Sequence, residues 1–109
     1  MIGRIFDNPA TFNGVATVPY YRLYNLGSRW HHWTTDANEY HTLANTPGWS
    51  AEGIDGFILP AQAAGSIPLY RLYLPGGGQH HWTTDANEAA VLVASFGWVS
   101  EGISGYLLP

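Results

Sequence analysis

One segment of the chain occurs twice, and this internal duplication constrains the fold more than any other feature. The heptapeptide Trp-Thr-Thr-Asp-Ala-Asn-Glu stands at residues 33–39 and again at residues 82–88. Around it, residues 18–60 align without a gap with residues 67–109. A unit of this length buries too little apolar surface to fold alone. We therefore expect the two copies, module 1 (residues 18–60) and module 2 (residues 67–109), to pack as a single domain over residues 1–109.

The composition excludes several classes of partner. Charged residues make up 11% of the chain, lysine is absent and the formal net charge is −4 at pH 7. Binders of nucleic acids and anionic membranes depend on clustered Lys and Arg, so we expect neither partner. No stretch approaches the roughly 20 apolar residues of a membrane-spanning helix.

The chain contains no cysteine, which excludes disulfides and thiol-based chemistry. The first residues do not have the pattern of a signal peptide. We expect a soluble protein that is cytoplasmic or exported without a classical signal.

Each module begins with the pattern of a β-hairpin. Residues 19–24 and 68–73 are rich in aromatic residues and start at a proline, which is typical of strands. A turn containing glycine follows, and residues 31–34 and 80–83 then form a second short strand. We expect one hairpin in each module.

Alternation along the first strand divides its side chains between two faces. Tyr21 and Leu23 point to one face, whereas Tyr20, Arg22 and Tyr24 point to the other. We expect the face with Tyr21 and Leu23 to form the core.

A helix follows each hairpin. Asp36 and Asp85 are typical N-cap residues, and Glu39 and Glu88 stand three positions later, as in a capping box. We expect each Glu side chain to bond back to the backbone N–H of the cap, which would leave it little other role.

A final strand completes each module. Gly48 and Gly97 supply the left-handed conformation that ends a helix. Residues 52–59 and 101–108 then alternate as a strand and stop at proline. Alternation predicts that Ile54 shares a face with Ile58.

The elements together predict a β-rich α+β fold. Two tandem strand-strand-helix-strand modules would pack as one domain with pseudo-twofold symmetry. The leading segment, residues 1–17, lies outside the duplication, but residues 2–6 resemble the last strand of a module. We expect these residues to add a strand at an open sheet edge.

The shared motif resembles a known family. The pattern His-x-Trp/Tyr-Thr-Thr-x-x-x-Glu, followed by Gly-Trp-x-x-Glu-Gly-Ile-x-Gly, is similar to a tandem-repeat family of unknown function. Its members occur in fungal proteins and beside hydrolase domains of secreted bacterial proteins. The resemblance covers residues 18–109 and implies a non-catalytic module that targets a polymer. The short, cysteine-free format is also similar to small fungal lectins.

The paired histidines are the first candidates for chemistry. His31 and His32 point to opposite faces of a strand, as do His80 and His81, so one module cannot chelate an ion with both. An ion shared by His31, His80 and a Glu stays possible, but we expect no metal and no cofactor. A neutral His bonded to Thr, Glu or a carbonyl is the simpler interpretation.

The two arginines have two open interpretations. A mid-strand cation is costly unless paired, so Arg22 and Arg71 could form structural ion pairs with Glu52 and Glu101. Alternatively, each guanidinium could line an open groove and bond adjacent sugar hydroxyls while an aromatic ring stacks on the sugar.

The tryptophans differ in expected exposure. Trp30 stands on a turn and is the ring most expected to be exposed. Trp49 and Trp98 follow the helix-ending glycines and are expected to plug the core.

The arguments for an enzyme are weaker. Glu52 and Asp55 should point to opposite faces of a strand, which does not suit two carboxylates flanking one bond. His32 and Thr34 could act as base and nucleophile, but no orienting acid is evident.

We therefore expect a non-catalytic carbohydrate-binding protein, a small lectin with two similar sites that gain strength through bivalency. The expected partner is a glycan or a cell-wall polysaccharide, and a homodimer is possible. The alternatives are a cell-wall polymer hydrolase with His32 as base, and a purely structural or protein-interaction repeat. The expected sugar-binding residues are Tyr20, Arg22, Tyr24, Trp30, His32, Trp33 and Asp55 in module 1, and Arg71, Tyr73, His81, Trp82 and Ser104 in module 2.

Overall fold

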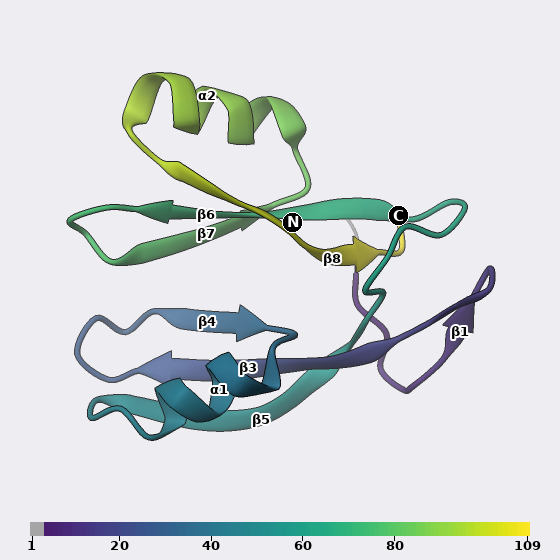
Figure 1. Cartoon of the computed structure of the whole chain (residues 1–109), viewed down its shortest axis with the longest axis horizontal. Helices are drawn as coiled ribbons and strands as arrows, with labels where there is room; N and C mark the ends of the chain where they lie inside the picture. Colours follow the sequence, from purple (N-terminus) through teal and green to yellow (C-terminus); the bar gives the residue numbers. More distant parts are fainter. Residues whose placement is uncertain (1–3) are drawn as a thin grey trace.

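The computed structural model of the chain describes residues 4–109 and has three small antiparallel sheets and two helices (Figure 1). A hairpin comes first, made of β1 (Thr11–Phe12) and β2 (Val15–Ala16). Module 1 contains β3 (Val18–Asn25), β4 (His31–Thr34), α1 (Ala37–Ala44) and β5 (Trp49–Ile58). Module 2 contains β6 (Ile67–Leu74), β7 (Gln79–Thr83), α2 (Ala86–Phe96) and β8 (Val99–Leu107). The β-rich α+β fold and the order strand, strand, helix, strand are confirmed.

The first strand of each module lies in the middle of its sheet. The strand orders are β4-β3-β5 and β7-β6-β8, with every pair antiparallel. The register places Arg22 opposite Trp33 and Arg71 opposite Trp82. Residues directly opposite each other share a face of the sheet, so each module has a front face with an Arg and a Trp side by side.

The hairpin of β1 and β2 was not expected from the sequence. Asn13 and Gly14 connect its strands with φ values of 46° and 86°. Such positive values suit the two central residues of a type I′ turn, for which Asn-Gly is the preferred pair. The dipeptide between two apolar residues was the signal that could have predicted this turn.

Both helices start where the capping residues predict. Asp36 accepts hydrogen bonds from the N–H groups of Asn38 and Glu39, and Asp85 makes the same two bonds in module 2. Gly97 ends α2 in the left-handed conformation, as expected. The expected stop at Gly48 is wrong, because α1 ends at Ala44 with Asn45 as its C-cap.

Neither helix within residues 4–109 has the length and apolar content needed to cross a membrane.

The last strand of each module is irregular, and this changes where its side chains point. The pairing of β3 with β5 shifts register between Tyr20 and Tyr21 and again between Tyr21 and Leu23. Gly53 lies in this stretch with φ of 84°. Each bulge adds a residue and reverses the alternation beyond it. As a result Ile54 is exposed although Ile58 is fully buried, so the expectation that they share a face is wrong.

The core uses both faces of the first strands. Leu23 is fully buried on the face that carries Tyr21, which stacks on Tyr40 of α1. Tyr20, on the opposite face, is also buried and packs in one cluster with Ile58, Leu69 and Leu107. The expectation of a single core face was therefore incomplete, because Tyr20 on the second face is buried between the modules.

Three short segments pair in a closed cycle where the modules meet. Phe6 pairs with Phe57, Leu59 pairs with Tyr106, and Leu108 pairs with Arg4. Each pair exchanges two backbone hydrogen bonds of 2.8–3.1 Å. Residues 4–6 thus reach an open edge, as predicted, through isolated bridges rather than a regular strand. Residues 2 and 3, part of the same prediction, lie outside the described residues.

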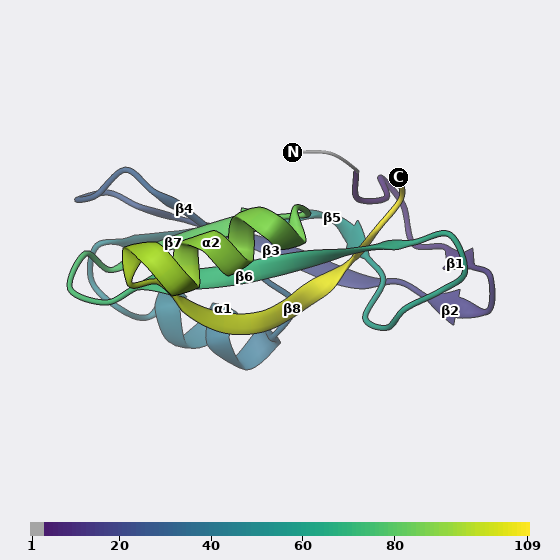
Figure 2. The same ribbon diagram turned by 90° about the horizontal axis from the view of Figure 1, so that it is seen from above.

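The contacts between the modules do not repeat across a twofold axis. Glu39 of module 1 binds Arg71 of module 2, whereas Arg22 binds only carboxylates of its own module within residues 4–109. A twofold axis would make the contacts reciprocal. The shortest extent of the molecule is 19 Å. Both sheets lie within this flat body (Figure 2). The pseudo-twofold arrangement is not confirmed.

Candidate functional site

The front face of module 1 holds a clasped arginine. Arg22 donates from Nε to Glu52 Oε1 at 2.8 Å and from Nη1 to Asp55 Oδ1 at 3.0 Å. His31 Nε2 lies 3.4 Å from the same Glu52 oxygen. The expectation that Glu52 and Asp55 point to opposite faces is wrong, because the two register shifts of β5 turn both side chains toward Arg22.

The front face of module 2 holds the equivalent arginine, but one of its carboxylates comes from module 1. Arg71 donates from Nε to Glu101 at 2.8 Å and from Nη1 and Nη2 to Glu39 at 3.1 and 3.3 Å. Burial opposes its charge, yet the hydrogen bonds and charges of Glu39 and Glu101 raise the pKa of Arg71 above its ordinary value. The ion-pair interpretation of both arginines is confirmed for Glu52 and Glu101.

On the side of each module opposite its front face, a histidine side chain lies close to a glutamate side chain. His32 Nε2 lies 3.1 Å from Glu39 Oε1, and His81 Nε2 lies 3.1 Å from Glu88 Oε1. The bond from His32, together with that from Arg71, holds the pKa of Glu39 well below its usual range. We call these two pairs the His–Glu pairs.

The His–Glu pairs correct the capping-box expectation. The backbone N–H of Asp36 donates to Thr34 Oγ1 at 3.0 Å, and that of Asp85 donates to Thr83. The Thr two residues before each cap therefore accepts the hydrogen bond that the Glu was expected to accept. The glutamates are free to bind His and, in module 1, Arg71.

A tryptophan pair marks the contact between the modules. The rings of Trp33 and Trp82 meet edge to face with their centroids 5.2 Å apart. Trp33 Nε1 donates to Asp55 Oδ2 at 3.0 Å. The residue equivalent to Asp55 is Ser104, which bonds Tyr20 Oη at 3.1 Å instead. Trp82 Nε1 is consequently buried without a hydrogen-bond partner within residues 4–109.

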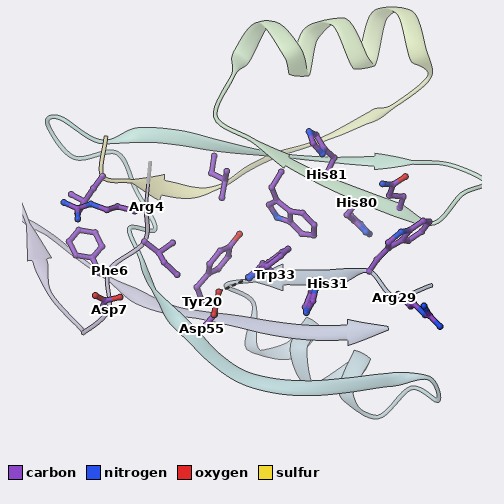
Figure 3. Close-up of a pocket in the computed structure, with 16 residues that line it drawn as sticks. Arg4, Phe6, Asp7, Tyr20, Arg29, His31, Trp33, Asp55, His80 and His81 are labelled. Carbon is purple, nitrogen blue, oxygen red and sulfur yellow. Dashed lines mark hydrogen bonds between the residues drawn. The ribbon is translucent and has the colours of Figure 1, made fainter. Parts of the chain in front are cut away.

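A large groove runs along the front of module 1 toward module 2 (Figure 3). Its volume is about 910 Å³. Tyr20, Trp33 and Asp55 lie at its centre, with His31 and His80 toward one end and Arg4 and Phe6 at the other (Figure 3). The remaining lining residues are Ile5, Asp7, Arg29, Trp30, Leu69, Gln79, His81, Trp82 and Leu108.

A smaller cavity lies at the tips of the two hairpins. Its volume is about 200 Å³. We call it the tip cavity, and its lining residues are Asn25, Ser28, Trp30, His31, His32, Trp49, Gly77, Gly78 and His80. Burial and the neighbouring His32 lower the pKa of His80, which favours a neutral ring that both donates and accepts hydrogen bonds.

The structure divides the expected sugar-binding residues among three places. The groove takes in Tyr20, Trp30, Trp33, Asp55, His81 and Trp82. The tip cavity takes in Trp30 and His32. Neither cavity is lined by Arg22, Tyr24, Arg71, Tyr73 or Ser104.

The expected exposure of the tryptophans is partly confirmed. Trp30 is exposed, as predicted. Trp49 is half-buried and lines the tip cavity rather than plugging the core.

Sequence reasoning missed some lining residues and treated others only as metal or structural candidates. Arg29, Gln79 and the glycines of the second turn were not selected, since turns gave no periodic signal. His31 and His80 were considered for a shared ion, but within residues 4–109 no group of three or more His, Asp or Glu side chains is arranged to hold a metal.

Comparison with known proteins identifies the family. No curated protein and no solved structure matches the chain. One family model, described as Domain of unknown function (DUF5648), matches residues 3–108. The match includes both modules and the leading segment of the bridged cycle. The chain therefore belongs to the family described as Domain of unknown function (DUF5648).

Proposed function

We propose that the protein is a non-catalytic carbohydrate-binding module whose sugar site is the tip cavity between the two hairpins. The observation that carries this proposal is the lining of that cavity, where two indole rings lie beside three imidazoles. Sugar sites combine an aromatic platform with a few placed hydrogen-bonding groups, and the tip cavity offers both.

The chemistry of the lining suits a neutral, hydroxylated ligand. The exposed ring of Trp30 gives a face on which the C–H groups of a sugar ring can stack. His31 and His80 offer imidazole nitrogens, and Asn25 and Ser28 add an amide and a hydroxyl. Groups that can donate and accept distinguish sugar hydroxyls from simple ions.

The arginines have a different part in this proposal from the one expected. Arg22 and Arg71 are held by carboxylates, so they stabilise the front faces rather than contact the ligand. The site also differs in number. It is formed jointly by the hairpin and Trp49 of module 1 and by the turn and His80 of module 2, so we propose one junction site instead of one site in each module.

The binding test is a glycan and cell-wall-polysaccharide array, followed by titration of hits against the intrinsic tryptophan fluorescence. A shallow site for one sugar ring should bind in the millimolar to micromolar range, about −4 to −8 kcal/mol. Trp30→Ala and Trp49→Ala should each abolish binding. Silence of the wild-type protein on every glycan and polymer would overturn the proposal.

Trp98→Ala is the matched control, because Trp98 is the module 2 equivalent of Trp49 and lines neither cavity. This variant should keep its affinity, with circular dichroism confirming that all three variants are folded. Equal loss in Trp98→Ala would attribute the effect to the fold and not to the tip cavity.

The hydrolase alternative receives less support. His32, its candidate base, is buried and bonded to Glu39. Thr34, the candidate nucleophile, accepts the backbone N–H of Asp36 through its Oγ1. Both side chains already have partners that explain their positions.

A further inference from the structure

The bridged cycle that joins the modules has three equivalent positions. In the sequence, Arg4, Ile5 and Phe6 align with Phe57, Ile58 and Leu59, and these align with residues 106–108. The last residue of each segment pairs with the first residue of the next, and the third segment returns to the first. The cycle is therefore pseudo-threefold, with module 1 at one position and module 2 at the next.

The packing around this cycle repeats in the same order. A Cβ built on Gly56 would meet Ile5 Cδ1 at 2.5 Å, and one built on Gly105 would meet Ile58 Cδ1 at 2.5 Å. Because Ile5 is the equivalent of Ile58, residues 4–6 occupy the place of the end of a module. The rest of a module does not stand at that third position.

The two surfaces that flank the third position match the two sides of the existing junction. At that junction the His–Glu pair of module 1 faces Arg71 and His80 of module 2, with the rings of His32 and His80 4.7 Å apart. The front of module 1 carries the equivalent Arg22 and His31, both uncovered, and His31 lines the groove. Module 2 presents its own His–Glu pair, also uncovered.

Side-chain exposure measures how much of this surface is open. Arg22 is 38% exposed, against 18% for Arg71 in the junction. His31 is 40% exposed, against 21% for His80. His81 is 40% exposed, against 4% for His32. For these three residues the open copy has about twice the exposure of the covered copy or more.

We propose that the groove is an assembly surface that accepts one further module of the same repeat, placed ahead of Arg4. The partner would present a His–Glu pair to Arg22 and an arginine-bearing front to Glu88. The match of both open surfaces to the two sides of the junction already formed supports this occupant. The inference goes beyond the proposed sugar site, which lies at the existing junction, although Trp30, His31 and His80 line both the groove and the tip cavity.

A second copy of this chain does not fit the same position. If module 2 of the second copy took the third position, module 1 of that copy would have to occupy the place where module 2 of the first copy stands. If module 1 of the second copy took the third position, module 2 of that copy would overlap module 1 of the first copy. Pseudo-threefold geometry therefore favours a single module over a dimer.

Asp55 is the main difference between the open and the covered front. In the junction Ser104 makes no hydrogen bond with Arg71, and both Nη1 and Nη2 of Arg71 donate to Glu39. On the open front Arg22 Nη1 donates to Asp55. Within residues 4–109 Arg22 Nη2 donates no hydrogen bond, so an incoming carboxylate still has a donor. Asp55→Ser should free the second donor and strengthen docking.

The test adds a module to the two-module chain. A copy of residues 67–104 is joined ahead of residues 3–109, so that its last strand runs into Arg4. The readout is diethyl pyrocarbonate modification of each histidine, mapped by mass spectrometry, with the melting temperature and the sedimentation coefficient of the same sample.

Docking predicts that His31 and His81 of the original modules lose their modification, while His41 on the exposed face of α1 keeps it. The melting temperature should rise and the chain should sediment as a compact monomer. An added module whose own His81 and Glu88 are changed to alanine should leave His31 of the original module 1 reactive. Asp55→Ser in the original module 1 should further reduce the modification of His31.

Two results would overturn the proposal. One is an added module that folds while His31 and His81 stay as reactive as in the two-module protein. The other is dimerisation of the two-module protein that protects His31, because the occupant would then be a second copy. Sugar binding is measured separately on the two-module protein, so its failure would leave this result unaffected.

Discussion

At the scale of single residues, one exchange between the modules explains several differences in bonding. Asp55 in module 1 accepts from both Arg22 and Trp33. Ser104, its equivalent, is too short and uncharged for these contacts and bonds Tyr20 instead. Burial raises the pKa of Tyr20 to about 12, so its hydroxyl stays neutral. Because Ser104 replaces the aspartate, Nη1 of Arg71 donates to Glu39 of the other module. Trp82 Nε1 has no hydrogen-bond partner within residues 4–109.

Trp33→Phe and Trp82→Phe test this difference. Both changes replace an indole with a smaller phenyl ring, but only Trp33→Phe removes a hydrogen bond to a carboxylate. We expect Trp33→Phe to cost about 1 kcal/mol more of the free energy of unfolding than Trp82→Phe. Urea denaturation of the two variants measures the difference, and an equal or larger loss in Trp82→Phe would contradict it.

Glu39→Gln tests the carboxylate shared between modules. The variant removes the charge that neutralises Arg71, whose side chain is mostly buried. We expect a loss of about 1–2 kcal/mol in the free energy of unfolding at pH 7, reduced by solvent screening of a partly exposed carboxylate.

The same variant predicts a pH dependence with a definite sign. The folded pKa of Glu39 is lowered, so its stabilisation is complete above the ordinary value of 4.5 and is lost as the pH falls toward the folded pKa. The difference in the free energy of unfolding between wild type and Glu39→Gln should therefore become smaller below pH 4.5. Glu88→Gln, the exposed equivalent, should change stability little at any pH, and a gap that widened in acid would contradict the argument.

At the scale of elements, the bulges of β5 and β8 determine which side chains can meet. Gly53 and Gly102 have φ values of 84° and 89°, and a Cβ at either would meet nothing within 4 Å. Their requirement for glycine is therefore one of backbone conformation and not of space. The bulge brings Glu52 and Asp55 to one arginine.

Gly53→Ala and Gly102→Ala should each cost about 1–2 kcal/mol of stability, since an L-residue is strained in this conformation. Gly77→Ala in the turn between β6 and β7 is the control, because Gly77 has no positive φ. Thermal melts of the three variants provide the comparison. A neutral Gly53→Ala would mean that β5 can pair without the bulge.

At the scale of the whole molecule, the two modules share one core. Tyr20 and Ile58 of module 1 form a single buried cluster with Leu69 and Leu107 of module 2. Residues 1–65 or 66–109 expressed alone would leave these side chains in water. We expect each half to be unfolded by circular dichroism at room temperature, and a cooperative thermal transition in either half alone would contradict a shared core.

Sequence patterns alone determined the local elements, because capping, alternation and turn residues act between near neighbours in the chain. Asp36 and Asp85 predicted where both helices start. The predicted ends of the first strands lie within one residue of their observed ends, at residues 18–25 and 67–74. The same local logic failed at β5, where an ideal alternation ignores the register set by β3.

Only the tertiary structure decided which surfaces meet. The sequence offered Glu39 as a capping residue, yet its carboxylate serves Arg71 in the other module. Duplication suggested a twofold, whereas the bridges between residues 4–6, 57–59 and 106–108 form a three-position cycle. Symmetry and shared sites depend on how modules pack, and equal copies can pack through unlike faces.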